Sequence, residues 1–177
     1  MSSLSILHGC ATVQLTQGQN TLIDERDAEW IRESKWCATW REDNASFYVV
    51  SYVRGGHPGQ MQLMHRAILE RLESPEPRAR GDHKNRDTLD NRRDNLRWAT
   101  GSQNRCNAAK KRWKGQASSQ YKGVKWAKRN SKWLATITKD GKQKYLGLYL
   151  DETAAARAYN VAATEMFGEF ARINEGV

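Results

Sequence analysis

The residues best suited to chemistry lie in the middle of the chain, where one histidine and several oxygen donors are spaced among arginines. Asp82 and His83 are adjacent, and they are followed by the run Leu89–Trp98 (LDNRRDNLRW) and then by Asn104. A neutral histidine can take a proton from water, and carboxylate and amide oxygens are the ligands that Mg²⁺ and Mn²⁺ prefer. In a basic chain, this combination predicts metal-assisted hydrolysis of a nucleic-acid phosphodiester.

Four polar residues of this central motif have predicted roles in the reaction. His83 is the expected general base, and Asp82 is the expected hard oxygen ligand of one Mg²⁺ or Mn²⁺ ion. The side-chain oxygen of Asn104 is a second ligand, and water and phosphate oxygens fill the remaining positions. Asn95 begins the second predicted strand and is expected to hold the His83 loop by hydrogen bonds. The bound ion would stabilise the charge of the transition state.

These residues resemble the HNH endonucleases of the phage and intron homing type. The resemblance implies a ββα-metal core with Asp82 and Asn104 as metal ligands, His83 as general base and Asn95 as the middle asparagine. The third motif position, often histidine in the wider family, is Asn104 here. Asn107 is a competing ligand on the same predicted helix.

The neighbours of this motif carry further expectations. Met64-His65-Arg66 also matches the family's lead-in, and His65 is interpreted as structural rather than catalytic. Arg92 and Arg93 are predicted to contact DNA. An inactive copy of the motif remains an alternative, in which the chain is a DNA-binding protein or regulator that does not cut.

Short elements must position the central run. The segment Met61–Leu72 predicts a strand end and a helix, and Asp82–Trp98 predicts two short strands joined by a long loop. Ala99–Lys111 predicts a helix capped near Thr100 or Ser102. Before them, residues 1–60 predict a β-rich segment with strands near Cys10–Leu15 and Ser46–Val53, turns at 16–20 and 54–59, and a helix within Asp24–Lys35 that buries Trp30 and Ile31.

The C-terminal part predicts a three-stranded antiparallel sheet packed on one helix. Asp140-Gly141 is a hairpin-turn signal, and Asp151 or Thr153 can cap a helix that ends near Phe167 and is closed by Gly168. The expected strands are Tyr121–Trp126, Lys132–Thr138 and Lys142–Tyr149. By strand alternation, Trp133, Ala135 and Ile137 should face the helix, and Leu134, Thr136 and Thr138 should face away from it.

This part resembles the Apetala-type DNA-binding domain of plant ethylene-response factors. The resemblance rests on YKGVKW at 121–126, KWLATI at 132–137, YLGLY at 145–149, AAARAY at 154–159 and FGEFA at 167–171. It implies that the sheet enters the DNA major groove. Several arginines of the plant pattern are replaced by Lys, Thr or Gln, which predicts weaker base discrimination and a larger share of phosphate contacts. The implied contacts are Lys122, Lys125, Thr136, Thr138, Gln143 and Tyr145, with phosphate contacts added by Lys142, Lys128 and Arg129.

The charge distribution supports a polyanionic partner. The 177-residue chain has a net charge of +9, and this divides into −2 over residues 1–60, +7 over 61–116 and +4 over 117–177. A basic balance confined to two thirds of a chain is typical of nucleic-acid binding. Three scattered cysteines disfavour a zinc finger. No leader or membrane-spanning run is evident, so we expect an intracellular, cytoplasmic protein.

Together these observations predict an α+β chain in four parts that binds double-stranded DNA as a monomer or weak dimer. The parts are a β-rich segment at 1–60, a ββα-metal nuclease core at 61–112, a basic linker at 113–119 and an Apetala-type domain at 120–177. One nuclease core cuts one strand, so a monomer should nick. An RNA nuclease is the remaining alternative, disfavoured because the RNA major groove is too narrow for readout by a sheet.

Overall fold

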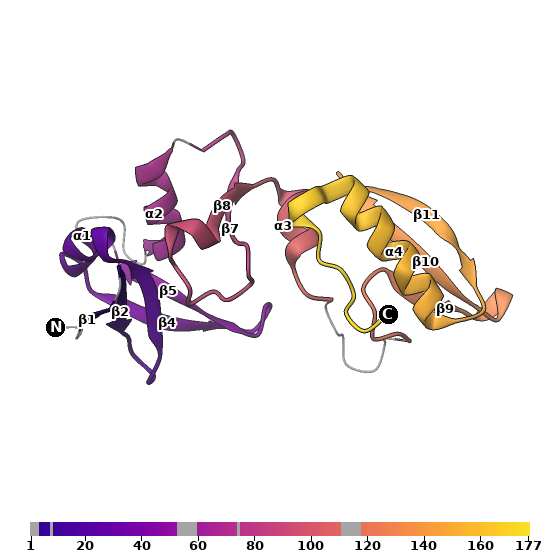
Figure 1. Cartoon of the computed structure of the whole chain (residues 1–177), viewed down its shortest axis with the longest axis horizontal. Coiled ribbons are helices and arrows are strands. Elements are labelled where there is room, and N and C mark those ends of the chain that lie inside the picture. Colours follow the sequence, from indigo (N-terminus) through magenta and orange to yellow (C-terminus); the bar gives the residue numbers. More distant parts are fainter. Residues whose placement is uncertain (1–3, 8, 53–59, 74, 111–117) are drawn as a thin grey trace. The chain divides into compact units, whose positions relative to one another are not determined.

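A computed structural model describes the chain except for residues 1–3, 8, 53–59, 74 and 111–117. The chain divides into two compact units, Met1–Ala99 and Thr100–Val177. Helices and small antiparallel sheets occur in both units, which confirms the α+β class (Figure 1). The predicted turn at 54–59 and most of the predicted linker lie outside the described residues, and the four-part division stays a prediction.

The first unit contains three small antiparallel sheets, with strand orders β1-β2-β3, β4-β5-β6 and β7-β8. Three of its strands, β1, β3 and β4, were not predicted from the sequence. The strands are β1 Leu4–Leu7, β2 Cys10–Gln14, β3 Asn20–Asp24, β4 Trp36–Arg41, β5 Ser46–Tyr52, β6 Met61–Leu63, β7 Arg80–His83 and β8 Leu96–Ala99. The helices are α1 Ala28–Arg32 and α2 Met64–Leu72, with short 3-10 turns η1 Glu25–Asp27 and η2 Arg93–Asn95.

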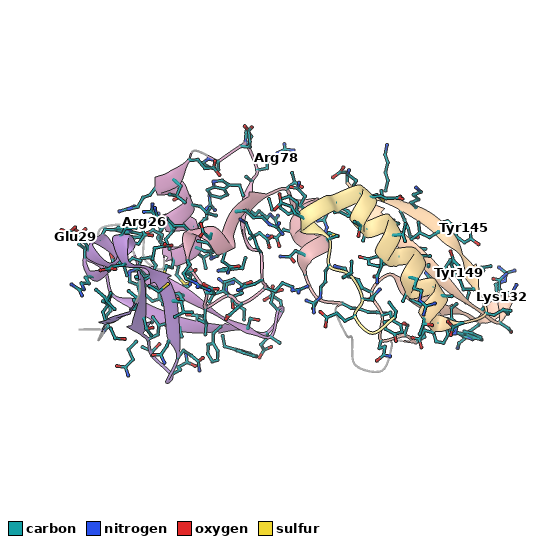
Figure 2. The ribbon with its side chains drawn as sticks, viewed as in Figure 1. Arg26, Glu29, Arg78, Lys132, Tyr145 and Tyr149 are labelled. Carbon is teal, nitrogen blue, oxygen red and sulfur yellow. The ribbon has the colours of Figure 1, made fainter. Side chains whose placement is uncertain are left out.

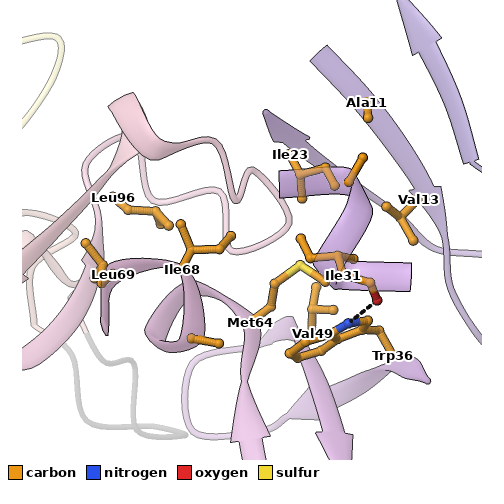
Figure 3. Packing of buried hydrophobic residues seen from close by; sticks show 12 residues of the cluster. Ala11, Val13, Ile23, Ile31, Trp36, Val49, Met64, Ile68, Leu69 and Leu96 are labelled. Carbon is orange, nitrogen blue, oxygen red and sulfur yellow. Dashed lines mark hydrogen bonds between the residues drawn. The ribbon is translucent and has the colours of Figure 1, made fainter. Parts of the chain in front are cut away.

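One apolar core connects the N-terminal strands to the central elements of this unit. Figure 3 shows Ile23 of β3 and Ile31 of α1 beside Met64 and Ile68 of α2. All four side chains are at most 1% exposed. The N-terminal segment and the central motif therefore share a core, and neither buries its apolar residues alone.

The prediction for Trp30 is wrong, whereas that for Ile31 is confirmed. Ile31 is 1% exposed, and its carbonyl accepts a hydrogen bond from Trp36 Nε1 at 2.9 Å (Figure 3). Trp30 is only half-buried, and the Arg71 guanidinium lies over its ring, 4.0 Å from the ring centroid. Its Nε1 donates to Asp27 Oδ1 at 2.9 Å, which keeps the indole at the edge of the core.

The second unit contains α3, the C-terminal sheet and α4. The sheet has the order β11-β10-β9, and α4 lies across one of its faces (Figure 1). This confirms the predicted three-stranded antiparallel sheet packed on a helix. The elements are α3 Gly101–Asn107, β9 Val124–Ala127, β10 Lys132–Lys139, β11 Lys142–Tyr149 and α4 Glu152–Phe167, with short 3-10 turns η3 Lys128–Asn130 and η4 Gly168–Phe170.

Local signals explain where these elements begin and end. Asp140 and Gly141 both have positive φ, as a tight hairpin turn requires. The Asp151 side chain accepts a hydrogen bond from the backbone N–H of Ala154 and caps α4, which ends at Gly168 with φ +52°. These three predictions are confirmed.

Helix α3 begins as predicted but is shorter. Thr100 and Gln103 form a reciprocal capping box at its start. The helix ends at Asn107, and Ala108 is extended, because the carbonyls of the last turn are bound by the Lys122 ammonium rather than by further helical turns. Within the described residues, no helix has the length and apolar character needed to cross a membrane.

Candidate functional site

Asp82 and His83 are the last two residues of strand β7, and both are buried. The pairing of β7 with β8 sets Asp82 opposite Arg97. Arg97 Nε donates to Asp82 Oδ2 at 2.9 Å, and the two side chains are 9% and 7% exposed. The carboxylate that the sequence predicts as a metal ligand is thus held in place by a neighbouring cation.

His83 lies among aromatic and polar side chains. Its Nε2 is 3.2 Å from Asn91 Oδ1, and its ring centroid is 4.8 Å from that of His65 and 6.4 Å from that of Tyr48. Burial lowers the pKa of His83, against the opposing effects of Asn91 and Asp82, and it lowers the pKa of His65 to about 3. Both imidazoles are therefore neutral at neutral pH, and a neutral imidazole can accept a proton.

Asn95 closes the loop between the two strands of this hairpin. Its Oδ1 accepts a hydrogen bond from the Asn85 backbone N–H at 2.9 Å, and its Nδ2 donates to the Asp90 carbonyl at 2.7 Å. The Lys84 N–H also donates to the Asn95 carbonyl at 2.8 Å. These bonds are the kind expected of a residue that holds the His83 loop, and a direct part for Asn95 in catalysis stays a prediction.

Asn104 and Asn107 lie on α3 of the second unit, where Asn104 is half-buried and Asn107 is buried. The helix is built into the apolar core of that unit through Cys106, which packs with Ile137, Tyr159 and Phe167. Ser102 Oγ accepts a hydrogen bond from the Asp140 backbone N–H at 2.9 Å. The C-terminal module therefore fixes the helix that carries both candidate ligands.

The donor chemistry of the predicted metal site fits a hard divalent ion. Among the described residues, no three or more His, Cys, Asp or Glu side chains gather as a metal-holding group. The predicted set is smaller, with the carboxylate of Asp82 and an amide oxygen from Asn104. Oxygen donors of this kind suit an ion such as Mg²⁺, which keeps several waters and binds phosphate oxygens.

Arg92 and Arg93, predicted to contact DNA, both form ion pairs inside the first unit. Arg92 binds Asp90 through Nε and Nη2, at 2.8 and 2.7 Å. Arg93 forms a bidentate ion pair with the fully buried Asp27, again through Nε and Nη2, at 2.8 and 2.7 Å. Burial raises the pKa of Asp27, but the hydrogen bonds from Arg93 and Trp30 outweigh it and lower that pKa overall.

Replacing Arg93 by methionine is expected to lower the free energy of unfolding by about 3 kcal/mol, because it leaves the carboxylate of Asp27 buried without its partner. Arg26→Met is the matched control, since Arg26 is 62% exposed and lies 3.4 Å from Asp24 (Figure 2). An exposed pair contributes at most about 1 kcal/mol. Urea unfolding followed by tryptophan fluorescence measures both variants, and equal losses would contradict the account.

The loss in Arg93→Met should also depend on pH. The pKa of Asp27 is lowered in the folded state, so the ion pair stabilises the fold fully above the ordinary carboxyl pKa of 3.8. This stabilisation is lost as the pH falls through the lower folded-state pKa. The difference between the wild type and Arg93→Met should therefore shrink below about pH 3.8, and a difference that persists there would contradict the assignment to Asp27.

Five of the predicted DNA-contacting residues share one face of the C-terminal sheet. Thr136 pairs with Tyr145 and Thr138 pairs with Gln143, so these four side chains point to the same side. Lys125, opposite Leu134, belongs to this face as well. Ala135 and Ile137 point to the other side and are buried, as predicted. Tyr145 is 62% exposed and projects outward from β11 (Figure 2).

Two of the predicted DNA-contacting lysines lie elsewhere. Lys122 Nζ donates to the carbonyls of Arg105, Cys106 and Ala108 at the end of α3. Lys142 pairs with Lys139, which places it on the opposite side of the sheet from Gln143, at the hairpin end. A contact of either lysine with DNA stays a prediction, and we leave both out of the proposed interface.

Comparison with known proteins identifies the central part. Residues 62–106 match the family model described as HNH endonuclease. This range begins at β6 and ends within α3, so it includes Asp82, His83, Asn95 and Asn104. The chain therefore carries an HNH endonuclease domain, which confirms the resemblance inferred from the sequence.

The relatives are of two kinds. A protein of Acanthamoeba polyphaga mimivirus, named as an uncharacterized HNH endonuclease, is 36% identical over 94 residues, which cover 53% of this chain and 46% of its own length. An AP2-like ethylene-responsive transcription factor of Arabidopsis thaliana is 44% identical over 70 residues of the C-terminal region, covering 34% of this chain and 16% of its own length.

A third relative extends the C-terminal match to rice. The APETALA2-like protein 2 of Oryza sativa subsp. indica is 47% identical over 57 residues, covering 32% of this chain and 13% of its own length. The chain thus spans less than half the length of each of these relatives. No solved structure matches it significantly.

Proposed function

We propose that this protein is a metal-dependent HNH endonuclease that hydrolyses phosphodiester bonds in double-stranded DNA. The observation that carries the proposal is the pair Asp82 and His83 at the end of β7, inside the segment that matches the HNH endonuclease model. The buried neutral histidine and the adjacent carboxyl group are the proton acceptor and the metal ligand that such a hydrolysis requires.

Each residue of the proposed centre has one task. His83 accepts the proton of the attacking water at a ring nitrogen, and Asn95 keeps the loop that follows His83 closed by its bonds to Asn85 and Asp90. Asp82 and Asn104 would hold one Mg²⁺ or Mn²⁺ ion. When bound, the ion supplies charge stabilisation at the phosphate and the leaving oxygen. One such centre per chain would nick a single strand, and a double-strand break would need two protomers.

The exposed face of the C-terminal sheet is the proposed DNA-binding surface. It carries Lys125, Thr138, Gln143 and Tyr145, all exposed, with Thr136 half-buried between the strands. The hydroxyl and amide groups can bond to base edges and phosphates alike. The likeness of the C-terminal region to plant proteins named as transcription factors supports DNA as the ligand of this module.

DNA binding through this face should weaken steeply with salt. Each phosphate contact contributes about 0.9 to the slope of log affinity against log salt concentration. Lys125→Ala should reduce that slope by about 1. Lys139→Ala is the matched control, because Lys139 points to the other side of the sheet and its Nζ donates to the Met166 carbonyl at 3.1 Å. Fluorescence anisotropy over a salt series measures both slopes, and the same slope in Lys125→Ala as in the wild type would contradict the proposed face.

The two alternatives, an RNA nuclease and a DNA-binding regulator that does not cut, predict different reaction products. Labelled DNA and RNA duplexes of the same sequence, incubated with the protein and Mg²⁺, should give cut DNA and intact RNA. Cut RNA with intact DNA would make the protein an RNA nuclease. A shifted but uncut DNA band would favour a regulator built on a nuclease scaffold.

The cytoplasmic location of the protein and its oligomeric state, a monomer or a weak dimer, stay predictions.

A further inference from the structure

The loop that carries Asn91 is bound to a strand from the far N-terminal part of the first unit. Leu22 of β3 donates through its N–H to the Leu89 carbonyl at 2.9 Å, and its own carbonyl accepts from the Asn91 N–H at 2.8 Å. Thr21, the residue before Leu22, is 1% exposed, as is Asn91. The strand therefore holds the backbone of the loop and brings a buried hydroxyl beside the asparagine that contacts His83.

The hydrogen-bond partners of Thr21 determine how the Asn91 amide is oriented. Thr21 Oγ1 lies 2.6 Å from the Leu89 carbonyl, which can only accept, so the single hydroxyl proton is used there. Oγ1 then accepts from Asn91 Nδ2 at 2.8 Å. The same Nδ2 also donates to the Thr88 carbonyl at 3.5 Å. The amide nitrogen is thus fixed toward two acceptors, and the opposite amide orientation would leave Thr21 Oγ1 without its donor.

The orientation of Asn91 in turn determines the tautomer of His83. With Nδ2 turned toward Thr21, the amide oxygen Oδ1 faces His83 Nε2 at 3.2 Å. An amide oxygen only accepts, so Nε2 must carry the proton. In a neutral imidazole the lone pair then lies on Nδ1. His65 and Tyr48 pack against the ring and limit its rotation.

We propose that Thr21 and Asn91 are positioning residues that keep the proton of His83 on Nε2 and so make Nδ1 the atom that accepts the proton of the attacking water. Both residues are 1% exposed and act on His83 only through the chain of hydrogen bonds from Thr21 to Asn91 and from Asn91 to His83. The N-terminal strand β3 is therefore a working part of the nuclease centre. The catalytic half of this inference rests on the proposed function, whereas the tautomer does not.

The tautomer is measured directly in the full chain. Long-range proton–nitrogen NMR correlations at neutral pH distinguish the two neutral forms of a ¹⁵N-labelled histidine, and His83→Gln identifies the signals. The wild type should show the form protonated on Nε2. Thr21→Val removes the hydroxyl and should give a mixture of forms, whereas Thr21→Ser keeps the hydroxyl and should behave as the wild type. A wild-type His83 protonated on Nδ1 would overturn the proposal without any variant having to fold.

Cleavage kinetics test the catalytic consequence. Thr21→Val should lower kcat by about tenfold to a hundredfold with KM unchanged, because general-base catalysis is weakened while DNA binding is not. Thr21→Ser should restore kcat. Equal losses in both variants, or a lower kcat with an unchanged tautomer, would reduce Thr21 to a structural role and overturn the proposal. If the wild type cuts nothing while the tautomer responds as expected, the proposed function fails and the control of the tautomer by Thr21 stands.

Discussion

Replacing His83 by alanine is expected to abolish DNA cleavage and to leave DNA affinity unchanged. The loss should be about 10²–10⁴-fold in the single-turnover rate, the range in which general-base catalysis contributes. Affinity should persist because His83 is 4% exposed and the proposed DNA-binding face lies on β9, β10 and β11. Rates on a labelled duplex and anisotropy on the same duplex measure the two quantities side by side.

His65 provides the matched control for this experiment. Its ring is buried at 4.8 Å from that of His83, so the two residues share one environment. His65→Gln should lower stability yet retain cleavage at low temperature, whereas His83→Gln should not cut. Wild-type cleavage by His83→Gln would rule out His83 as the base. Loss of cleavage in a folded His65→Gln alone would assign the chemistry to the other ring.

A chain that ends at residue 112 is expected to lose cleavage altogether, even at protein concentrations that saturate DNA. Helix α3 has seven residues, far too few to be stable by itself in water. In the second unit it is held by the packing of Cys106 against Tyr159 and by the Lys122 ammonium at its carbonyls. Without these contacts Asn104, the proposed second metal ligand, has no fixed position.

A point variant separates this effect from simple loss of DNA binding. Lys122→Met removes the ammonium that binds the end of α3, and it should lower the cleavage rate at saturating DNA. Lys125→Met removes an exposed lysine of the DNA-binding face, and it should weaken affinity and leave the saturated rate unchanged. A truncated chain that nicks DNA as fast as the full chain would show that α3 works without the C-terminal module.

The local elements of this protein were predictable because their signals lie within a few residues of one another. Asp140-Gly141 defines a hairpin turn by its backbone preference alone, and Asp151 caps α4 through a bond to the residue three positions on. The spacing from His83 to Asn95 likewise lies within one hairpin. Such patterns depend on the backbone preferences and side-chain bonds of residues close together in the sequence, so they can be predicted from it.

The contacts that hold the candidate site join residues far apart in the chain. Such long-range contacts cannot be predicted from a local sequence pattern. Thr21 and Asn91 are 70 positions apart, and Asp27 and Arg93 are 66 apart. A guanidinium such as that of Arg93 looks the same in a sequence whether it faces DNA or a buried carboxylate. Arg93 binds Asp27 of η1 and so joins that turn to the central loop, whereas a contact of Arg92 or Arg93 with DNA stays a prediction.

The most direct test is supercoiled plasmid incubated with the protein and Mg²⁺ or Mn²⁺, beside a reaction with EDTA, and resolved on an agarose gel. Nicked circles should form with either ion, and EDTA should stop their formation. Undiminished cleavage in EDTA would contradict a centre built on Asp82 and Asn104. Intact plasmid with every ion, together with a clear mobility shift, would contradict the nuclease itself.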